Sequence, residues 1–374
     1  MSPNNLITGR RISNRRSATR LRSSITGLLG VILLGACSLV EPIPAAVEAP
    51  TATAPVAEAV PISVDQPAEP TPFEATPTLE PIRFTFPSAG APPESIWRPP
   101  LYPVPWAPSE HDHFYFIRPI GANQVNWPDG TYRYGGIFFE DVVHSGVDIG
   151  APEGTPVLAA GPGKVIWAGY GLYSGVEGPD DPYGIAVAIR HDFGFDGQTL
   201  YSLYGHLSRV DVIRGQLVEA GHALGQVGTT GFTTGPHLHF EVRLGNNDFF
   251  TTYNPELWIA PPEGWGVLVG RVMGTAGQLL FRQTMTVTNL DTGRVWETIT
   301  YADQISVNSD PHYRENFVIG DLPAGRYSVA TWYLGRFKTI EFEILPGRVT
   351  YFHFRGMDGF SFGTPDELRP TPTP

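Results

Sequence analysis

The chain has 374 residues, of which 17% are charged, and it contains 42 glycines and 37 prolines. This composition is typical of an exported globular protein built from strands and turns rather than from long helices. The formal net charge of −12 argues against a nucleic acid as partner, because an acidic surface repels phosphates.

The first 36 residues have the pattern of an export signal. Six arginines and no acidic residue precede an apolar run at 28–34 that is too short to span a bilayer comfortably. The run ends in LGAC at 34–37, which resembles the bacterial lipobox, and Cys37 is the only cysteine of the chain. An ordinary secretory signal with a coincidental cysteine is the alternative. We expect residues 1–36 to be a lipoprotein signal peptide and Cys37 to be lipidated, which anchors an exported protein to the bacterial cell envelope.

The next segment predicts a tether. Residues 37–83 are rich in Pro, Ala, Thr and Glu and poor in large apolar side chains. Such a segment cannot bury enough surface to offset its ordering entropy, so we expect disorder there. Aromatic residues return among prolines at 84–106, which predicts irregular chain packed on the following domain.

The segment HSGVDIG at 144–150 is the first to combine possible metal ligands. Its glycines and the following Pro152 argue against a helix and predict a strand or an extended loop. In extended chain, a separation of four residues places His144 and Asp148 on one side. Because Cys37 is the only cysteine, a metal site in this protein must use histidine and carboxylate ligands.

Short apolar runs then alternate with Gly, Pro and Asp. We predict that the first two runs form a hairpin and that the next two form a second antiparallel pair. A long loop rich in Gly and Asp, at 171–183, is placed to border a cleft, and His206 lies at a predicted strand end, where active-site residues often sit. The predicted strands are 154–160, 164–170, 184–190, 198–204 and two within 215–228.

His237 and His239 alternate with apolar residues in PHLHFE at 236–241, so a strand sends both imidazoles to one face. A lone histidine in a strand is more often structural, and one strand supplies too few ligands for zinc. Together with His144 and Asp148, however, a histidine of this pair gives two imidazoles and one carboxylate, the open ligand set of catalytic zinc.

Three sequence blocks, taken together, resemble a known family. HSGVD at 144–148, YGHL at 204–207 and GFTTGPHLHFE at 231–241 look like the signature blocks of the lysostaphin-like (LytM-type) peptidoglycan metalloendopeptidases, in the same order and at compatible spacing. The resemblance implies an antiparallel β-sheet peptidase domain at 84–262, with its core at 114–258. It also implies Zn²⁺ as cofactor, peptidoglycan as substrate, and a set of site residues. The implied metal ligands are His144, Asp148 and His239, and the implied catalytic histidines are His206 and His237.

Three other residues have less certain roles. The family uses an aromatic hydroxyl near the metal, and Tyr132 and Tyr134 are candidates by position, although both are equally compatible with packing. Glu241 projects on the same side as His239. It could orient a metal ligand, but we expect a surface carboxylate.

Residues 265–356, after the PPEG boundary at 261–264, contain about seven short strands, which predict an antiparallel β-sandwich. Segments at 270–272, 287–289 and 317–327 resemble the carboxypeptidase-regulatory/transthyretin-like folds. This module shows no cluster of metal ligands or nucleophiles, so we expect a spacer or a binding module. Residues 357–374 end in a Pro/Thr-rich stretch that predicts a disordered tail.

The sequence therefore predicts a mainly β protein, with a LytM-type peptidase domain followed by a small Ig-like/transthyretin-like sandwich. Its expected function is zinc-dependent hydrolysis of peptide stems or cross-bridges of peptidoglycan during cell-wall remodelling. One alternative is a catalytically inactive regulator of wall hydrolases. The other is a surface adhesin that uses the peptidase fold as a scaffold.

Overall fold

The computed structural model describes residues 98–121, 132–139 and 142–367. The predicted signal peptide, Cys37 and the tether lie outside the described residues, as do residues 368–374 of the predicted C-terminal tail. The described part consists of strands and three-residue 3₁₀-helices, so the predicted mainly β fold class is confirmed. No helix in these ranges is long and apolar enough to cross a membrane.

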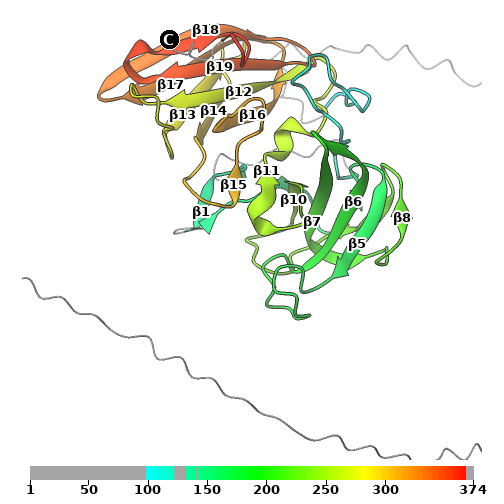
Figure 1. Cartoon of the computed structure of the whole chain (residues 1–374). Helices are drawn as coiled ribbons and strands as arrows, with labels where there is room; N and C mark the ends of the chain where they lie inside the picture. The colour runs from blue at the N-terminus through cyan, green and yellow to red at the C-terminus, as the bar shows by residue number, and fades with distance from the viewer. Residues whose placement is uncertain (1–97, 122–131, 140–141, 368–374) are drawn as a thin grey trace, which may run out of the picture. The chain divides into compact units, whose positions relative to one another are not determined.

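The first large sheet is organised around β10 (His237–Leu244) (Figure 1). This strand pairs antiparallel with β3 (Val147–Gly150) on one side and β7 (Gln198–Val210) on the other. Beyond β7 the sheet continues with β6 (Ile185–Phe195), β5 (Gly163–Gly169) and β8 (Leu217–Val218). The sheet also contains β4 (Pro156–Leu158), β9 (Ala223–Val227) and β11 (Thr252–Tyr253). Strands β1 (Ile137–Phe139) and β2 (Val142–Val143) form a separate two-stranded sheet.

Two predictions about these strands have different outcomes. The second predicted pair is confirmed, because β6 and β7 are antiparallel neighbours. The predicted first hairpin is wrong: β4 pairs with β9, whereas β5 pairs with β6 and β8. The backbone after β4 is held elsewhere, since Ala159 N–H donates to the His222 carbonyl and Ala160 N–H donates to the Tyr204 hydroxyl.

Successive side chains of β10 point to opposite faces, so core residues lie on one face and site residues on the other. Leu238, Phe240 and Val242 are fully buried in the main core, which also contains Phe116 and Trp258. Burial of each such side chain stabilises the fold by about 1.5–3 kcal/mol. The intervening residues, which include the two histidines, face the opposite side of the strand.

The C-terminal module extends to residue 362, beyond the predicted bound at 356, because β20 (Phe360–Phe362) lies in the stretch that was predicted to be a disordered tail. That part of the tail prediction is wrong. The module forms two four-stranded sheets whose facing side chains share a second core. The first sheet has the order β16 (Phe317–Pro323), β12 (Trp265–Met273), β19 (Val349–Arg355) and β20. The second has the order β14 (Val295–Ile299), β13 (Thr284–Asn289), β17 (Gly325–Tyr333) and β18 (Arg336–Ile344).

The sequence predicted a sandwich that is antiparallel throughout, and this prediction is wrong for one strand pair. Strands β12 and β19 are parallel neighbours. A parallel pair requires a long crossover connection. Here the crossover runs from 274 to 348 and contains the whole second sheet, which explains why local strand order did not reveal the pairing.

A short loop before His144 is enclosed by residues of the C-terminal module. Strand β15 (Val307–Asn308) pairs in parallel with β11, at the edge of the first large sheet. Asn308 N–H donates to the Tyr134 hydroxyl over 2.7 Å, and the ring of Tyr301 packs edge-on against that of Tyr134. The backbone of Gly135 lies directly against Tyr301.

This contact predicts the effect of Gly135→Ala. A Cβ at this position would lie 2.7 Å from Cδ1 of Tyr301. We expect the substitution to lower the free energy of unfolding by about 1–3 kcal/mol through overpacking alone, as measured by urea denaturation. Gly175→Ala is the matched control, because Gly175 has a φ of 72° against 73° for Gly135 but no atom within 4 Å of its added Cβ. Equal destabilisation of the two variants would contradict the enclosed loop.

Candidate metal centre

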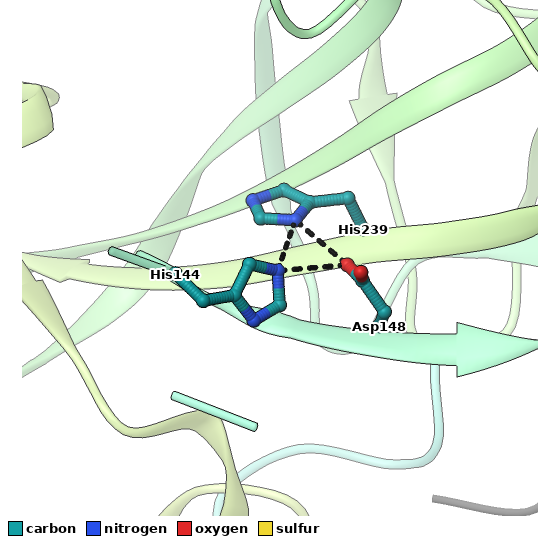
Figure 2. A group of neighbouring side chains, drawn as sticks. All are labelled: His144, Asp148 and His239. Carbon is teal, nitrogen blue, oxygen red and sulfur yellow. Dashed lines mark hydrogen bonds and ion pairs between the residues drawn. The ribbon is translucent and has the colours of Figure 1, made fainter. Parts of the chain in front are cut away.

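Three side chains from two segments converge at one point (Figure 2). Oδ1 of Asp148 lies 2.9 Å from Nε2 of His144 and 3.0 Å from Nδ1 of His239. The two histidine nitrogens are 3.1 Å apart. The register of the sheet brings these side chains together, because Asp148 on β3 lies directly opposite His239 on β10.

The backbone fixes His144 in the turn between β2 and β3. Its N–H donates to the Gly136 carbonyl and its carbonyl accepts from Gly135 N–H. Nδ1 of its ring faces the Arg133 carbonyl at 3.3 Å, which directs Nε2 toward Asp148. Gly146 permits the turn to approach β10, since a Cβ there would lie 2.4 Å from the Phe240 carbonyl oxygen.

The three donor atoms fit a zinc ion. Zinc bonds of about 2.0–2.1 Å in a tetrahedral arrangement place ligand atoms about 3.3 Å apart, and the observed separations are 2.9 to 3.1 Å. Two imidazole nitrogens and one carboxylate oxygen are also the donor types that zinc prefers in catalytic sites. The side of the cluster without a protein ligand faces a cavity.

Glu241 belongs to this centre, and its predicted surface position is wrong. The side chain is fully buried and its Oε1 lies 3.1 Å from Nε2 of His239. It also accepts hydrogen bonds from Ser145, from the Tyr183 hydroxyl and from Nε of Arg243. Burial opposes its charge, but Arg243 and then His239 lower the pKa of Glu241 to about 2. A buried carboxylate therefore orients the ring of one candidate ligand.

His239 lies between two carboxylates as a result. Burial favours the neutral ring, but hydrogen bonds with Asp148 and Glu241 outweigh burial and raise the pKa of His239 to about 9. The pKa of Asp148 is held well below its usual range, since its histidine neighbours overcome the effect of burial. A metal ion that binds Nδ1 must therefore displace a proton from His239.

His206 and His237 lie beside the cluster, with their ring centroids 4.7 Å apart. Nδ1 of His206 is 2.8 Å from the Thr230 carbonyl, and Nδ1 of His237 is 2.8 Å from the Gly235 carbonyl. Each Nδ1 must donate to its carbonyl, which leaves Nε2 as the basic nitrogen. Burial lowers the pKa of both rings, that of His206 to about 3 with help from its histidine neighbours.

The backbone at His206 differs from its prediction. The residue lies within β7 rather than at a strand end, and its φ of 61° is in the left-handed region. This conformation is uncommon for a residue with a side chain. At this point β7 changes partner, because Gly205 pairs with β10 and Leu207 pairs with β9.

A cavity of about 300 Å³ opens over the cluster, and all five predicted site residues, four histidines and one aspartate, line it. The loop at 171–183 borders it, as predicted, through Tyr173, Pro182 and Tyr183. Tyr132 also lines the cavity, whereas the Tyr134 hydroxyl is buried and donates to the Thr252 carbonyl. The other wall residues are mainly apolar and include Val142, Val143, Phe232 and Phe249.

Comparison with known proteins agrees with the sequence blocks. Residues 142–250 match the sequence profile of Peptidase family M23. The DD-carboxypeptidase/endopeptidase Mpg of Neisseria meningitidis serogroup B is 38% identical over 128 residues, which are 34% of this chain and 26% of Mpg. Lysostaphin of Staphylococcus staphylolyticus is 34% identical over 133 residues, which are 36% of this chain and 25% of lysostaphin.

Among solved structures, the catalytic domain of lysostaphin from Staphylococcus simulans is 30% identical, with a TM-score of 0.30, and the match covers 36% of this chain and 90% of that domain. The chain spans about a quarter of the length of the two curated relatives. The matched segment includes both ligand-bearing strands and both neighbouring histidines. Residues 142–250 are therefore similar to peptidase family M23.

Proposed function

We propose that this protein is a zinc-dependent endopeptidase that hydrolyses peptide stems or cross-bridges of peptidoglycan. The observation that carries the proposal is the convergence of His144, Asp148 and His239 on one cavity, beside two histidines whose basic nitrogens are available. The names of the relatives Mpg and lysostaphin support a peptidase of this class. The lipobox-like sequence at Cys37 supports export and lipid anchoring at the cell envelope.

The proposed zinc ligands are His144 Nε2, one oxygen of Asp148 and His239 Nδ1. When bound, zinc lowers the pKa of a coordinated water and polarises the scissile carbonyl. The protein supports this chemistry by fixing the ligands: the Arg133 carbonyl orients His144, and Glu241 orients His239.

We assign proton transfer to His237 and His206. Both rings are neutral near pH 7, because burial lowers their pKa, so each can accept a proton at Nε2. Nε2 of His237 lies 3.5 Å from Oδ2 of Asp148, and a carboxylate there stabilises an imidazolium. The rings beside His206 are those of His237 and His239. His237 is therefore the better base for the attacking water, and His206 is placed to hydrogen-bond the developing oxyanion or the leaving amine.

The cavity walls indicate the kind of peptide that binds. Apart from the cluster and its two histidines, no charged side chain of the described residues lines the cavity, and aromatic rings form much of the lining. Such walls suit an extended peptide with small uncharged side chains, held by its backbone.

The first test separates metal binding from catalysis. We expect the purified chain to bind one zinc ion and to release cleaved peptides from peptidoglycan, as detected by mass spectrometry, and EDTA to abolish release. His237→Ala should keep its zinc and lose activity by at least about 100-fold, because only the proton acceptor is removed. His222→Ala is the control, since this exposed histidine lies outside the cavity. Full activity of His237→Ala would exclude the assigned role, and wild-type protein that binds zinc without cleaving any peptidoglycan would favour a regulator.

The second test concerns Glu241. Replacing its carboxylate by an amide weakens the hydrogen bond that orients the His239 ring. We therefore expect Glu241→Gln to lower zinc affinity by about 10- to 100-fold. Competition with a chromophoric chelator measures this affinity without reference to activity. Glu315→Gln is a control for the packing of a buried amide, because Glu315 is also fully buried but lies in the C-terminal module. Burial and Asp310 raise the pKa of Glu315 to about 8, so this variant does not control for the loss of a negative charge. Unchanged zinc affinity in a folded Glu241→Gln variant would show that this carboxylate does not orient the ligand.

A further inference from the structure

A second cavity, of about 250 Å³, lies in the C-terminal module. It is distinct from the metal centre and shares no lining residue with it. Three of the 25 basic side chains of this acidic chain gather around it. Its lining consists of Arg271, Met273, Gly277, His312, Tyr313, Arg314, Tyr351, His353, Arg355 and Pro365.

The parallel pairing of β12 and β19 builds one wall of this cavity. Arg271 stands opposite His353, and Met273 stands opposite Arg355. Because side chains alternate along a strand, the residues between them point the other way, and Phe352 and Phe354 are fully buried in the sandwich core. The register of a single strand pair thus places two arginines and a histidine on one outward face.

The loop before β16 supplies the opposite wall and the third arginine. Arg314 has a φ of 49°, and its carbonyl accepts a hydrogen bond from the Arg271 guanidinium. The Tyr351 hydroxyl donates to the Tyr313 carbonyl over 2.8 Å, which ties this loop to β19. Tyr313 and Tyr351 are 3% and 5% exposed and form a rigid floor.

The arginines of this cavity have no carboxylate partner among the described residues. The nearby acids pair with histidines instead, Asp196 with His312 and Asp366 with His111. Burial and the neighbouring Arg271 and Arg355 lower the pKa of His353 to about 4, so the imidazole is neutral and adds no further charge. Its Nε2 lies 2.9 Å from the Tyr351 hydroxyl.

We propose that this cavity, which we call the arginine pocket, binds an oxyanion, a carboxylate or a phosphate group. Guanidinium groups present two parallel N–H donors that match both anions, and such charge-assisted hydrogen bonds are stronger than neutral ones. The volume accommodates a small anion or the anionic end of a larger molecule. The assignment makes the C-terminal module a binding module, and it is independent of the proposed peptidase function.

The test is calorimetric titration of the full chain with inorganic phosphate and, separately, with acetate, at constant ionic strength. Arg271→Gln and Arg355→Gln should each weaken binding by at least about tenfold, because one bidentate donor is lost. Arg348→Gln is the charge-matched control, since this exposed arginine precedes β19 at its opposite end. The variant His144→Ala distinguishes anion binding in the pocket from anion binding at the metal centre.

Each outcome decides the proposal. Binding that persists in Arg348→Gln and His144→Ala but is weakened in Arg271→Gln and Arg355→Gln supports the arginine pocket. The anion that binds with the higher affinity, phosphate or acetate, then identifies the ligand chemistry. Binding that His144→Ala abolishes and the two pocket variants retain would place the anion at the metal centre and overturn the proposal. The absence of saturable binding of either anion up to about 10 mM would also overturn it.

Discussion

The pairing of β10 with β3 and β7 is the constraint on which the rest of the structure depends. One face of β10 fills the core with Leu238, Phe240 and Val242, and the other carries His237, His239 and Glu241. A shift of one residue in register would exchange these two faces. The hydrophobic energy that fixes the register therefore also fixes the position of His239 opposite Asp148. Core packing thus sets the position of His239 opposite Asp148, and hydrogen bonds such as that with Glu241 then orient the ring.

The centre also requires buried charges, which are costly unless they are paired. In this structure each buried charge lies next to a group of opposite charge. Ion pairs and hydrogen bonds link Asp148, His239, Glu241 and Arg243 in a continuous series. Apolar residues of similar volume would often stabilise a core as well or better. We infer that this series is present for the chemistry of the site, with Glu241 as its link between a ligand and an arginine.

Local patterns predicted most of the site, and distant pairing explains what they missed. Alternation placed His237 and His239 on one face, and the three family blocks brought in His144, Asp148 and His206. The burial of Glu241 could have been suspected from Arg243, which follows at the next position on the same face, since the two charges pair. The arginine pocket had no local signal, because Arg271 and His353 meet only through a parallel pairing across a long crossover. The pairing of β4 with β9 was missed for the same reason.

The proposed function requires that His144, Asp148 and His239 hold one zinc ion. Anomalous X-ray scattering from crystals of the zinc-loaded protein, measured on both sides of the zinc absorption edge, locates such an ion. We expect one strong peak about 2.0–2.2 Å from His144 Nε2, an oxygen of Asp148 and His239 Nδ1. No peak at this position, or a peak only at the surface group of Glu110, His111 and Asp366, would contradict it.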